Sequence, residues 1–160
     1  MYTDASHANL PDGVGSTGGF IVFIRGENGE CSPLYWESKR IRRVVRSTIA
    51  AETLAATEGI DMALYLSDVI SQIICNGKSE CIPVKLYIDN KSLYENVYST
   101  KNVSEKRLRI DIAVMKELVD ENKLNIKWVE SKSQIADVLT KKGVNTSKIL
   151  NALELGSLPL

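Results

Sequence analysis

VKLYID, at residues 84–89, decides the fold of this chain, because its alternation of apolar and polar side chains predicts a half-buried strand that ends on an acid. Before it, apolar residues recur at helical spacing from about Ser47 to the breaker pair Asn76-Gly77. After it, a second helical pattern spans about Ser104–Glu121 and a second alternating stretch spans Leu124–Trp128. Because a strand–helix–strand step requires a right-handed parallel crossover, this half of the chain predicts parallel strands.

The first forty residues predict antiparallel strands instead. Three short stretches, joined by glycine-rich turns, have strand character: Tyr2–Ser6, Phe20–Ile24 and Leu34–Trp36. The element order is therefore β-β-β-α-β-α-β-α, in which the region 92–121 holds either one helix or two. The tail over about 134–153 reads as helical, with an interruption near Gly143. The sequence thus predicts an α/β fold in which a mixed sheet carries helices on its faces.

Length and composition predict one domain over residues 1–160. With 44% hydrophobic and 25% charged residues, the chain is neither a disordered nor a fibrous protein. No apolar run approaches the roughly 18 residues that a membrane span needs, so no membrane partner is expected. Nothing resembles a signal peptide, and we expect the chain to be a piece of a longer polypeptide.

The formal net charge is zero, so nucleic-acid binding would need a local basic patch. The sequence contains one such patch of five cations: Lys39, Arg40, Arg42, Arg43 and Arg46. The three cysteines match no metal spacing and His7 is the single histidine, which argues against a zinc site. A disulfide between Cys75 and Cys81 is an alternative, but reduced thiols are favoured. His7 is expected to be a surface or turn residue.

Four acids stand where chemistry is expected. Asp4 interrupts the first strand and Glu52 lies one turn into the first long helix. Asp89 ends the strand at 84–89, and Asp137 starts the last helical pattern. Taken singly, each has an ordinary explanation, such as a turn former or an acid favoured by a helix dipole. Taken together, they would gather at one end of the sheet, where buried carboxylates need a cation. Oxygen ligands without His or Cys indicate Mg²⁺ or Mn²⁺.

At these acids the sequence resembles the ribonuclease H domain of retroelements, most closely that of the copia-type long-terminal-repeat retrotransposons. The matching pieces occur in the family's order over about residues 2–141: Tyr2–Ser6, Trp36–Lys39, Ser47–Glu52, Tyr87–Ser92 and Ile135–Lys141. The stretch from Ala136 to Lys141 (ADVLTK) is the most specific of them, whereas the opening Tyr2-Thr3-Asp4 alone is weak.

The resemblance implies a ribonuclease H-like fold, a five-stranded mixed sheet in the order 3-2-1-4-5 with helices on both faces. Its core would cover about residues 2–141, followed by a C-terminal helix and tail to residue 160. The implied activity is hydrolysis of the RNA strand of RNA–DNA hybrids with two Mg²⁺ ions, for which Mn²⁺ can substitute. The implied partner is a reverse transcriptase domain of the same polyprotein, in a retroelement particle in the cytoplasm or the nucleus.

The resemblance also implies a role for each acid. Asp4 would bridge both metal ions, and Asp137 would complete the site of the ion that activates the attacking water. Glu52 and Asp89 would hold the ion near the leaving 3′ oxygen, giving 5′-phosphate and 3′-hydroxyl products. Cellular and retroviral relatives place a histidine on the loop before the last acid, but this chain has none between Asp89 and Asp137. Copia-type domains are similar in this respect, and Lys132 or Gln134 are alternatives for the missing role.

Substrate contacts are expected just before Glu52. Ser47 and Thr48 would offer hydroxyl and N–H donors to a phosphate, with Arg43 and Arg46 beside them. Asn90 would reach the minor groove, where 2′-hydroxyl groups distinguish RNA from DNA. The alternative is that Ser47 is an N-cap and the arginines form a solvated edge. Trp36 and Trp128 lie within strands and are expected in the core.

Three other functions compete with this hypothesis. A degenerate or domesticated copy would bind hybrid or a protein partner without cutting, although the intact acids argue against it. A DNA-cutting nuclease or transposase of the same fold relies on a different spacing of its acids. A small-molecule α/β enzyme would need a Gly-x-Gly-x-x-Gly turn that opens a helix, which the glycines at 13–19 do not supply.

Overall fold

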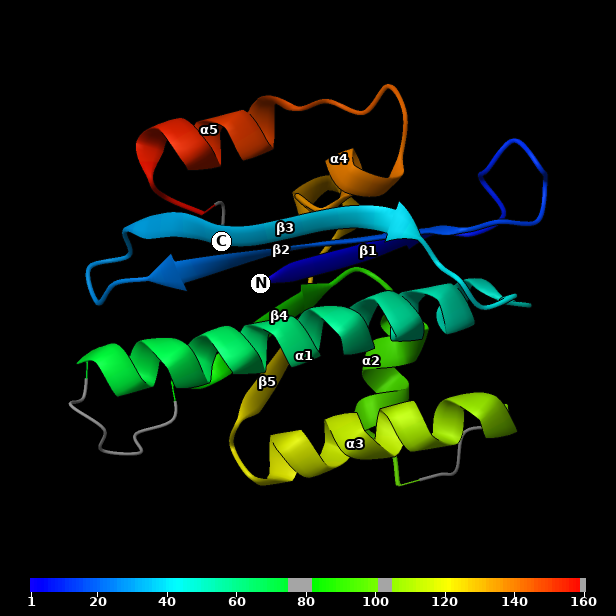
Figure 1. Cartoon of the computed structure of the whole chain (residues 1–160), viewed down its shortest axis with the longest axis horizontal. Helices are drawn as coiled ribbons and strands as arrows, with labels where there is room; N and C mark the ends of the chain where they lie inside the picture. Colours follow the sequence, from blue (N-terminus) through cyan, green and yellow to red (C-terminus); the bar gives the residue numbers. More distant parts are fainter. Residues whose placement is uncertain (75–81, 101–104, 159–160) are drawn as a thin grey trace.

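A computed structural model describes residues 1–74, 82–100 and 105–158. Five strands and three helices build its frame, and two further helices follow near the C-terminus (Figure 1). The strands are β1 (Tyr2–Ser6), β2 (Thr17–Arg25), β3 (Cys31–Arg40), β4 (Val84–Ile88) and β5 (Leu124–Trp128). The α-helices are α1 (Thr48–Ile74), α2 (Lys91–Tyr98), α3 (Arg109–Asp120), α4 (Asp137–Thr140) and α5 (Ser147–Leu155), and the 3₁₀ turns are η1 (Lys106–Leu108) and η2 (Ser131–Ser133).

The five strands form one mixed sheet in the order β3-β2-β1-β4-β5, which confirms the predicted order. β1 pairs antiparallel with β2, and β2 pairs antiparallel with β3. β1 pairs parallel with β4, and β4 pairs parallel with β5. The crossover through α1 therefore places β4 beside β1, so that the carboxyl ends of these two strands meet at the same edge of the sheet.

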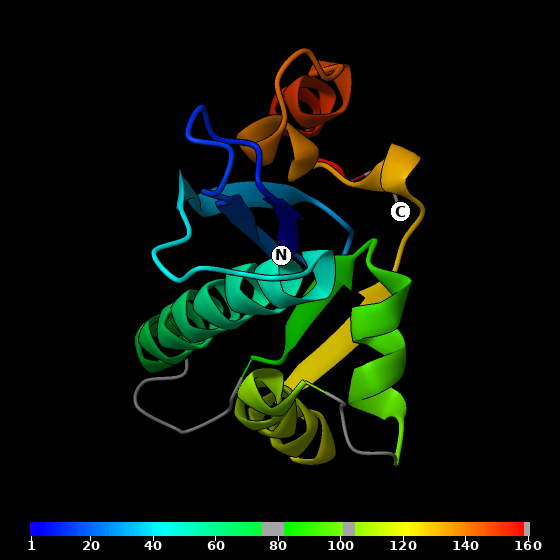
Figure 2. The same ribbon diagram turned by 90° about the vertical axis from the view of Figure 1, so that its right-hand side faces the viewer.

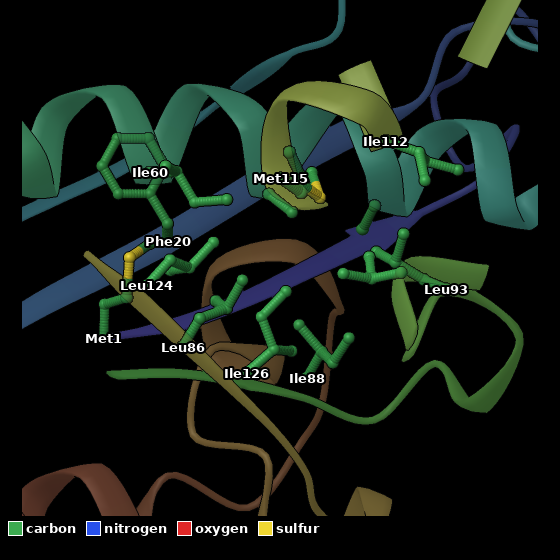
Figure 3. Packing of buried hydrophobic residues seen from close by; sticks show 14 of the residues in the cluster. Met1, Phe20, Ile60, Leu86, Ile88, Leu93, Ile112, Met115, Leu124 and Ile126 are labelled. Carbon is green, nitrogen blue, oxygen red and sulfur yellow. The ribbon is translucent and has the colours of Figure 1, made fainter. Parts of the chain in front are cut away.

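The larger core lies between the sheet and α1, α2 and α3, which cover one face (Figure 1). α1 packs across β1 and β2, and α3 packs on β5. Figure 3 shows how the apolar side chains of the strands and helices interlock in this layer, as for Leu86 and Ile126 from the paired strands and Met115 from α3. Each of these three side chains is at most 2% exposed. α1 and β4 also contact each other in this layer, which fixes Glu52 on α1 relative to Asp89 at the end of β4.

α1 approaches the sheet closely at Gly59. A Cβ added to this glycine would lie 3.0 Å from Thr3 Cγ2 and 3.1 Å from Phe20 Cβ. We expect Gly59→Val to lower the free energy of unfolding by about 2–3 kcal/mol, because the added methyl groups overpack this contact. Urea unfolding would measure the loss, with Ala113→Val on the exposed face of α3 as the control for valine in a helix. Equal stability of the two variants would contradict the close approach.

α4 and α5 cover the opposite face of the sheet (Figure 2), so helices lie on both faces as predicted. A second cluster of buried residues lies under them: Tyr2, Ile21, Ile135 and Ala136. The rings of Tyr2 and Tyr87 stack with their centroids 4.7 Å apart, which joins β1 to β4 on this face. Ser38 on β3 donates to the carbonyl of Leu139 at 2.5 Å, and this hydrogen bond ties α4 to the antiparallel edge of the sheet.

Two predictions about elements need correction or completion. Trp36 and Trp128 are not core residues, since 61% and 45% of their surfaces are exposed. Both lie on edge strands, where a side chain can sit in a regular strand without a helix over it. The region 92–121 forms two α-helices, α2 and α3, and the tail forms α4 and α5 on either side of Gly143. Cys75 and Cys81 lie outside the described residues.

Candidate metal centre

Asp4, Glu52 and Asp89 converge at one edge of the sheet. Asp4 lies within β1, Asp89 follows the last residue of the neighbouring parallel strand β4, and Glu52 faces them from the first turns of α1. One carboxylate oxygen of each lies within 4.8 Å of the other two. The parallel pairing of β1 and β4 brings the two aspartates together, and the packing of α1 on β1 supplies the glutamate.

Asp4 is fully enclosed, with 1% of its surface exposed. Burial raises the pKa of its carboxyl group to about 6, against the lowering effects of the Thr140 hydrogen bond and the Lys141 charge. Thr140 Oγ1 donates to Asp4 Oδ2, and Lys141 Nζ lies 3.3 Å from Asp4 Oδ1. Both residues come from the end of α4, so the helix on the second face directly fixes the carboxylate on β1.

Glu52 has the least satisfied side chain of the group. It is 4% exposed, and its Oε2 has no hydrogen-bond partner. Burial, followed by the negative charges of Asp4 and Asp89, raises the pKa of Glu52 to about 9. An orphaned, buried carboxylate oxygen that faces two further carboxylates is an arrangement that a divalent cation would relieve. The donor set is all oxygen, which fits Mg²⁺ or Mn²⁺.

Asp89 is half-buried and is held from the β5 side of the sheet. Ser131 Oγ donates to Asp89 Oδ2 at 2.7 Å, and Trp128 Nε1 donates to the Asp89 carbonyl oxygen at 3.0 Å. The next residue, Asn90, caps α2 by accepting a hydrogen bond from the Leu93 N–H at 2.9 Å. The backbone at Asp89 is thus fixed by the helix that follows it and its side chain by the turn η2.

Asp137 is near the three acids but does not join them. Asp137 is the first residue of α4. Among the described residues, the acids whose carboxylate oxygens lie close enough to bind one metal ion are Asp4, Glu52 and Asp89. Lys141 Nζ lies 2.7 Å from Asp137 Oδ1 and bridges it to Asp4. Burial by itself lowers the pKa of Lys141, but the Asp137 hydrogen bond and the Asp4 charge outweigh it and raise the pKa to about 12.

An open pocket of about 430 Å³ lies over the acids. Of the five residues predicted to contact substrate, Thr48 and Asn90 line this pocket. The Ser47 hydroxyl instead caps α1 by accepting from the Ala50 N–H at 3.2 Å, as its structural alternative predicted. Arg43 and Arg46 are exposed in the segment before α1 and do not line the pocket.

The structure gives the residues around the acids contacts that the sequence did not predict. His7 is an exposed turn residue, as predicted, but it also lines the pocket, and its Nε2 lies 3.3 Å from the carbonyl oxygen of Val45, next to the basic segment. Gln134 is buried and donates to the Thr3 carbonyl at 2.9 Å, so it is committed to the fold rather than to a loop role. Lys132 is 77% exposed and paired with Glu130. Lys141 was named in the sequence only as the last residue of the ADVLTK stretch, and the signal for its ion pair was its spacing of four residues from Asp137, which puts both on one side of a helical turn.

No protein-family model matches the chain. Among curated proteins, it is similar to the retrovirus-related Pol polyprotein from transposon RE1 of Arabidopsis thaliana, at 28% identity over 141 residues. It is also similar to the Pol polyprotein from transposon TNT 1-94 of Nicotiana tabacum, at 26% identity. Each similarity covers 88% of this chain, but the chain spans only 9% and 10% of these two relatives. The resemblance to retrotransposon Pol proteins is thereby confirmed.

The solved structures that are similar include ribonuclease H domains. LC11-RNase H1 in complex with an RNA/DNA hybrid has a TM-score of 0.62 at 18% identity, over 93% of this chain and 96% of that one. The N-terminal RNase H domain of Rv2228c from Mycobacterium tuberculosis has a TM-score of 0.61 at 17% identity, over 96% and 91% of the two chains. A foamy virus protease-reverse transcriptase has a TM-score of 0.51 at 19% identity, over 90% of this chain and 21% of the viral one.

Proposed function

We propose that this chain, which has the ribonuclease H fold, is the ribonuclease H domain of a retroelement Pol polyprotein and cuts the RNA strand of RNA–DNA hybrids with the help of divalent metal ions. The convergence of Asp4, Glu52 and Asp89 carries the proposal, because three carboxylates gathered at one edge of the sheet repel one another unless a cation holds them. Burying them costs stability, and a cation would offset that cost.

Asp4, Glu52 and Asp89 would hold the first ion, and Asp4 together with Asp137 would hold a second. Such a pair of ions activates a water and stabilises the leaving oxygen of a phosphodiester. The protein's own residues orient the ligands. Thr140 fixes Asp4, Ser131 fixes Asp89, and the packing of α1 on β1 aims Glu52 at both.

The surroundings of the pocket support a nucleic-acid substrate. Thr48 and Asn90 at its rim offer polar groups, and exposed arginines follow the end of β3: Arg42, Arg43 and Arg46. Among the described residues none of these three arginines forms an ion pair, so all are available for phosphate oxygens. Backbone contacts of this kind position a duplex without reading its sequence. A hybrid is the ligand of one structural neighbour, LC11-RNase H1.

An attached reverse transcriptase belongs to the same proposal. The similar Pol polyproteins are about ten times longer than this chain, and a foamy virus protease-reverse transcriptase contains a domain of the same fold. The chain carries no net charge, so a neighbouring domain would add affinity for the hybrid. No described helix is long and apolar enough to cross a membrane.

A cleavage assay with three substrates tests the proposal. The protein is incubated with an RNA–DNA hybrid, an RNA duplex and a DNA duplex, each labelled on both strands, in Mg²⁺, in Mn²⁺ and in EDTA. We expect only the RNA strand of the hybrid to be cut, in either metal, and removal of the metal by EDTA to stop the reaction. Tight binding of hybrid without cutting would support a degenerate copy instead. Equal cutting of the DNA duplex would support a DNA nuclease of the same fold.

A further inference from the structure

Lys141 divides the acidic site into two unequal parts. On one side, Asp4, Glu52 and Asp89 hold their oxygens within 4.8 Å of one another. On the other side, Asp137 is bound to the ammonium group of Lys141 at 2.7 Å. The same ammonium group lies 3.3 Å from Asp4 Oδ1, so it stands between the two aspartates that a second metal ion would need.

The local fold holds Lys141 in this place. Its backbone N–H donates to the Asp137 carbonyl oxygen at 2.9 Å, which closes the single turn of α4 and keeps the two side chains on one side of it. The neighbouring Thr140 is 5% exposed and donates to Asp4, which anchors the end of α4 to β1. The Lys141 side chain itself is 36% exposed, so its ammonium group has a path to solvent that the Asp4 carboxylate lacks.

We propose that Lys141 is a built-in counterion that competes with the second divalent cation for Asp4 and Asp137. The chain alone then binds one ion readily at Asp4, Glu52 and Asp89, and binds a second only when the Lys141 side chain swings away from Asp137. The Lys141 ammonium group and a divalent cation are both positively charged and would repel each other if they bound the same carboxylate. The two therefore cannot lie between Asp4 and Asp137 at the same time. The phosphate backbone of a nucleic acid is the anion that would receive the displaced ammonium group.

Coupling between metal and substrate follows from this competition. A phosphodiester that draws Lys141 outward frees Asp137 for the second ion, and by linkage the second ion tightens the binding of the phosphodiester to the same degree. The complete site is then assembled only on substrate. The inference rests on the proposed metal site, but it does not depend on whether the chain cuts the hybrid.

Mn²⁺ binding to the chain without nucleic acid tests the inference, with free Mn²⁺ followed by electron paramagnetic resonance. We expect the wild-type chain to bind one Mn²⁺ ion tightly. For the second ion, we expect the dissociation constant of the wild type to be at least about tenfold higher than that of Lys141→Met. Lys141→Arg keeps the cation and should behave as the wild type. Lys142→Met removes the exposed lysine next in sequence and is the matched control for net charge. Thermal unfolding of each variant confirms that it is folded.

A double variant localises the effect. Asp137→Asn combined with Lys141→Met should lose the second ion that Lys141→Met gains. The inference is overturned if Lys141→Met and the wild type bind their second ion equally, if Lys142→Met reproduces the gain, or if no variant binds Mn²⁺. The cleavage assay judges the proposed function separately, because a chain that fails to cut can still show the Lys141-dependent second ion, and a chain that cuts can lack it.

Discussion

Asp4→Asn is expected to lower the rate of metal-dependent cutting of the hybrid by about a thousandfold or more, equivalent to about 4 kcal/mol of transition-state stabilisation. Asp4 stands at the centre of the site. It shares the three-acid group with Glu52 and Asp89, and Lys141 joins it to Asp137. An asparagine fills the same space and can still accept the hydrogen bond from Thr140, but it has no charge to hold a cation.

The stability of Asp4→Asn shows whether a loss of cutting comes from the missing charge or from unfolding of the chain. The substitution removes both an ion pair with Lys141 and a buried charge, so we expect the free energy of unfolding to change by no more than about 1 kcal/mol. Single-turnover cleavage and thermal unfolding are measured side by side, with Asp120→Asn at the exposed end of α3 as the matched control. Retained cutting by a folded Asp4→Asn chain would remove this acid from the reaction.

Glu52→Gln is expected to abolish cutting and yet to stabilise the chain in the absence of metal. The Glu52 carboxyl group is 4% exposed, and its pKa is raised to about 9, chiefly by burial. A folded-state pKa above the unfolded value makes folding costlier as pH rises from about 5 toward 9, because the folded chain must retain a proton that the unfolded chain releases. Near pH 7 this cost is about 3 kcal/mol, and a glutamine avoids it.

The pH dependence is the decisive measurement for Glu52. In EDTA, the gain in unfolding free energy of Glu52→Gln over wild type should be near zero at pH 4.5 and should grow through neutral pH. Saturating Mg²⁺ should stabilise the wild type and leave Glu52→Gln unchanged, since ligand binding to the folded state alone shifts unfolding by mass action. Asp68→Asn, an exposed substitution on the same helix, should show neither effect. A gain that is independent of pH would contradict a buried, protonated Glu52.

The mixture of antiparallel and parallel strands could be predicted because it follows from general constraints on chain connection, whereas the order 3-2-1-4-5 was implied by the resemblance to the ribonuclease H domain. Tight glycine turns allow only antiparallel neighbours for the first three strands, and the crossover through α1 forces β4 to run parallel to β1. Once β1 and β4 are neighbours, Asp4 and Asp89 must lie at one edge of the sheet. This part of the site was therefore encoded by periodicity and by two acids at strand positions.

The rest of the site depends on tertiary contacts that leave no periodic pattern in the sequence. Asp137 was expected beside the other acids, but a lysine four residues later holds it apart, and an ion pair across one helical turn is common on any protein surface. In the sequence Ser131 resembles an ordinary loop serine, because its hydrogen bond to Asp89 depends on the pairing of β5 with β4. The exposure of Trp36 and Trp128 was missed for a related reason, since strand alternation does not say whether a helix covers the edge of the sheet.

The order in which a ribosome would deliver these residues gives the joining of α4 to β1 a consequence for synthesis. Thr140 and Lys141, which contact the Asp4 carboxylate, follow it in the chain by 136 and 137 positions. A nascent chain that ends before α4 contains β1 but lacks Thr140 and Lys141, the two residues that hold the Asp4 carboxylate. The contacts that fix the Asp4 carboxylate therefore form only after the sheet and α4 have both been synthesised.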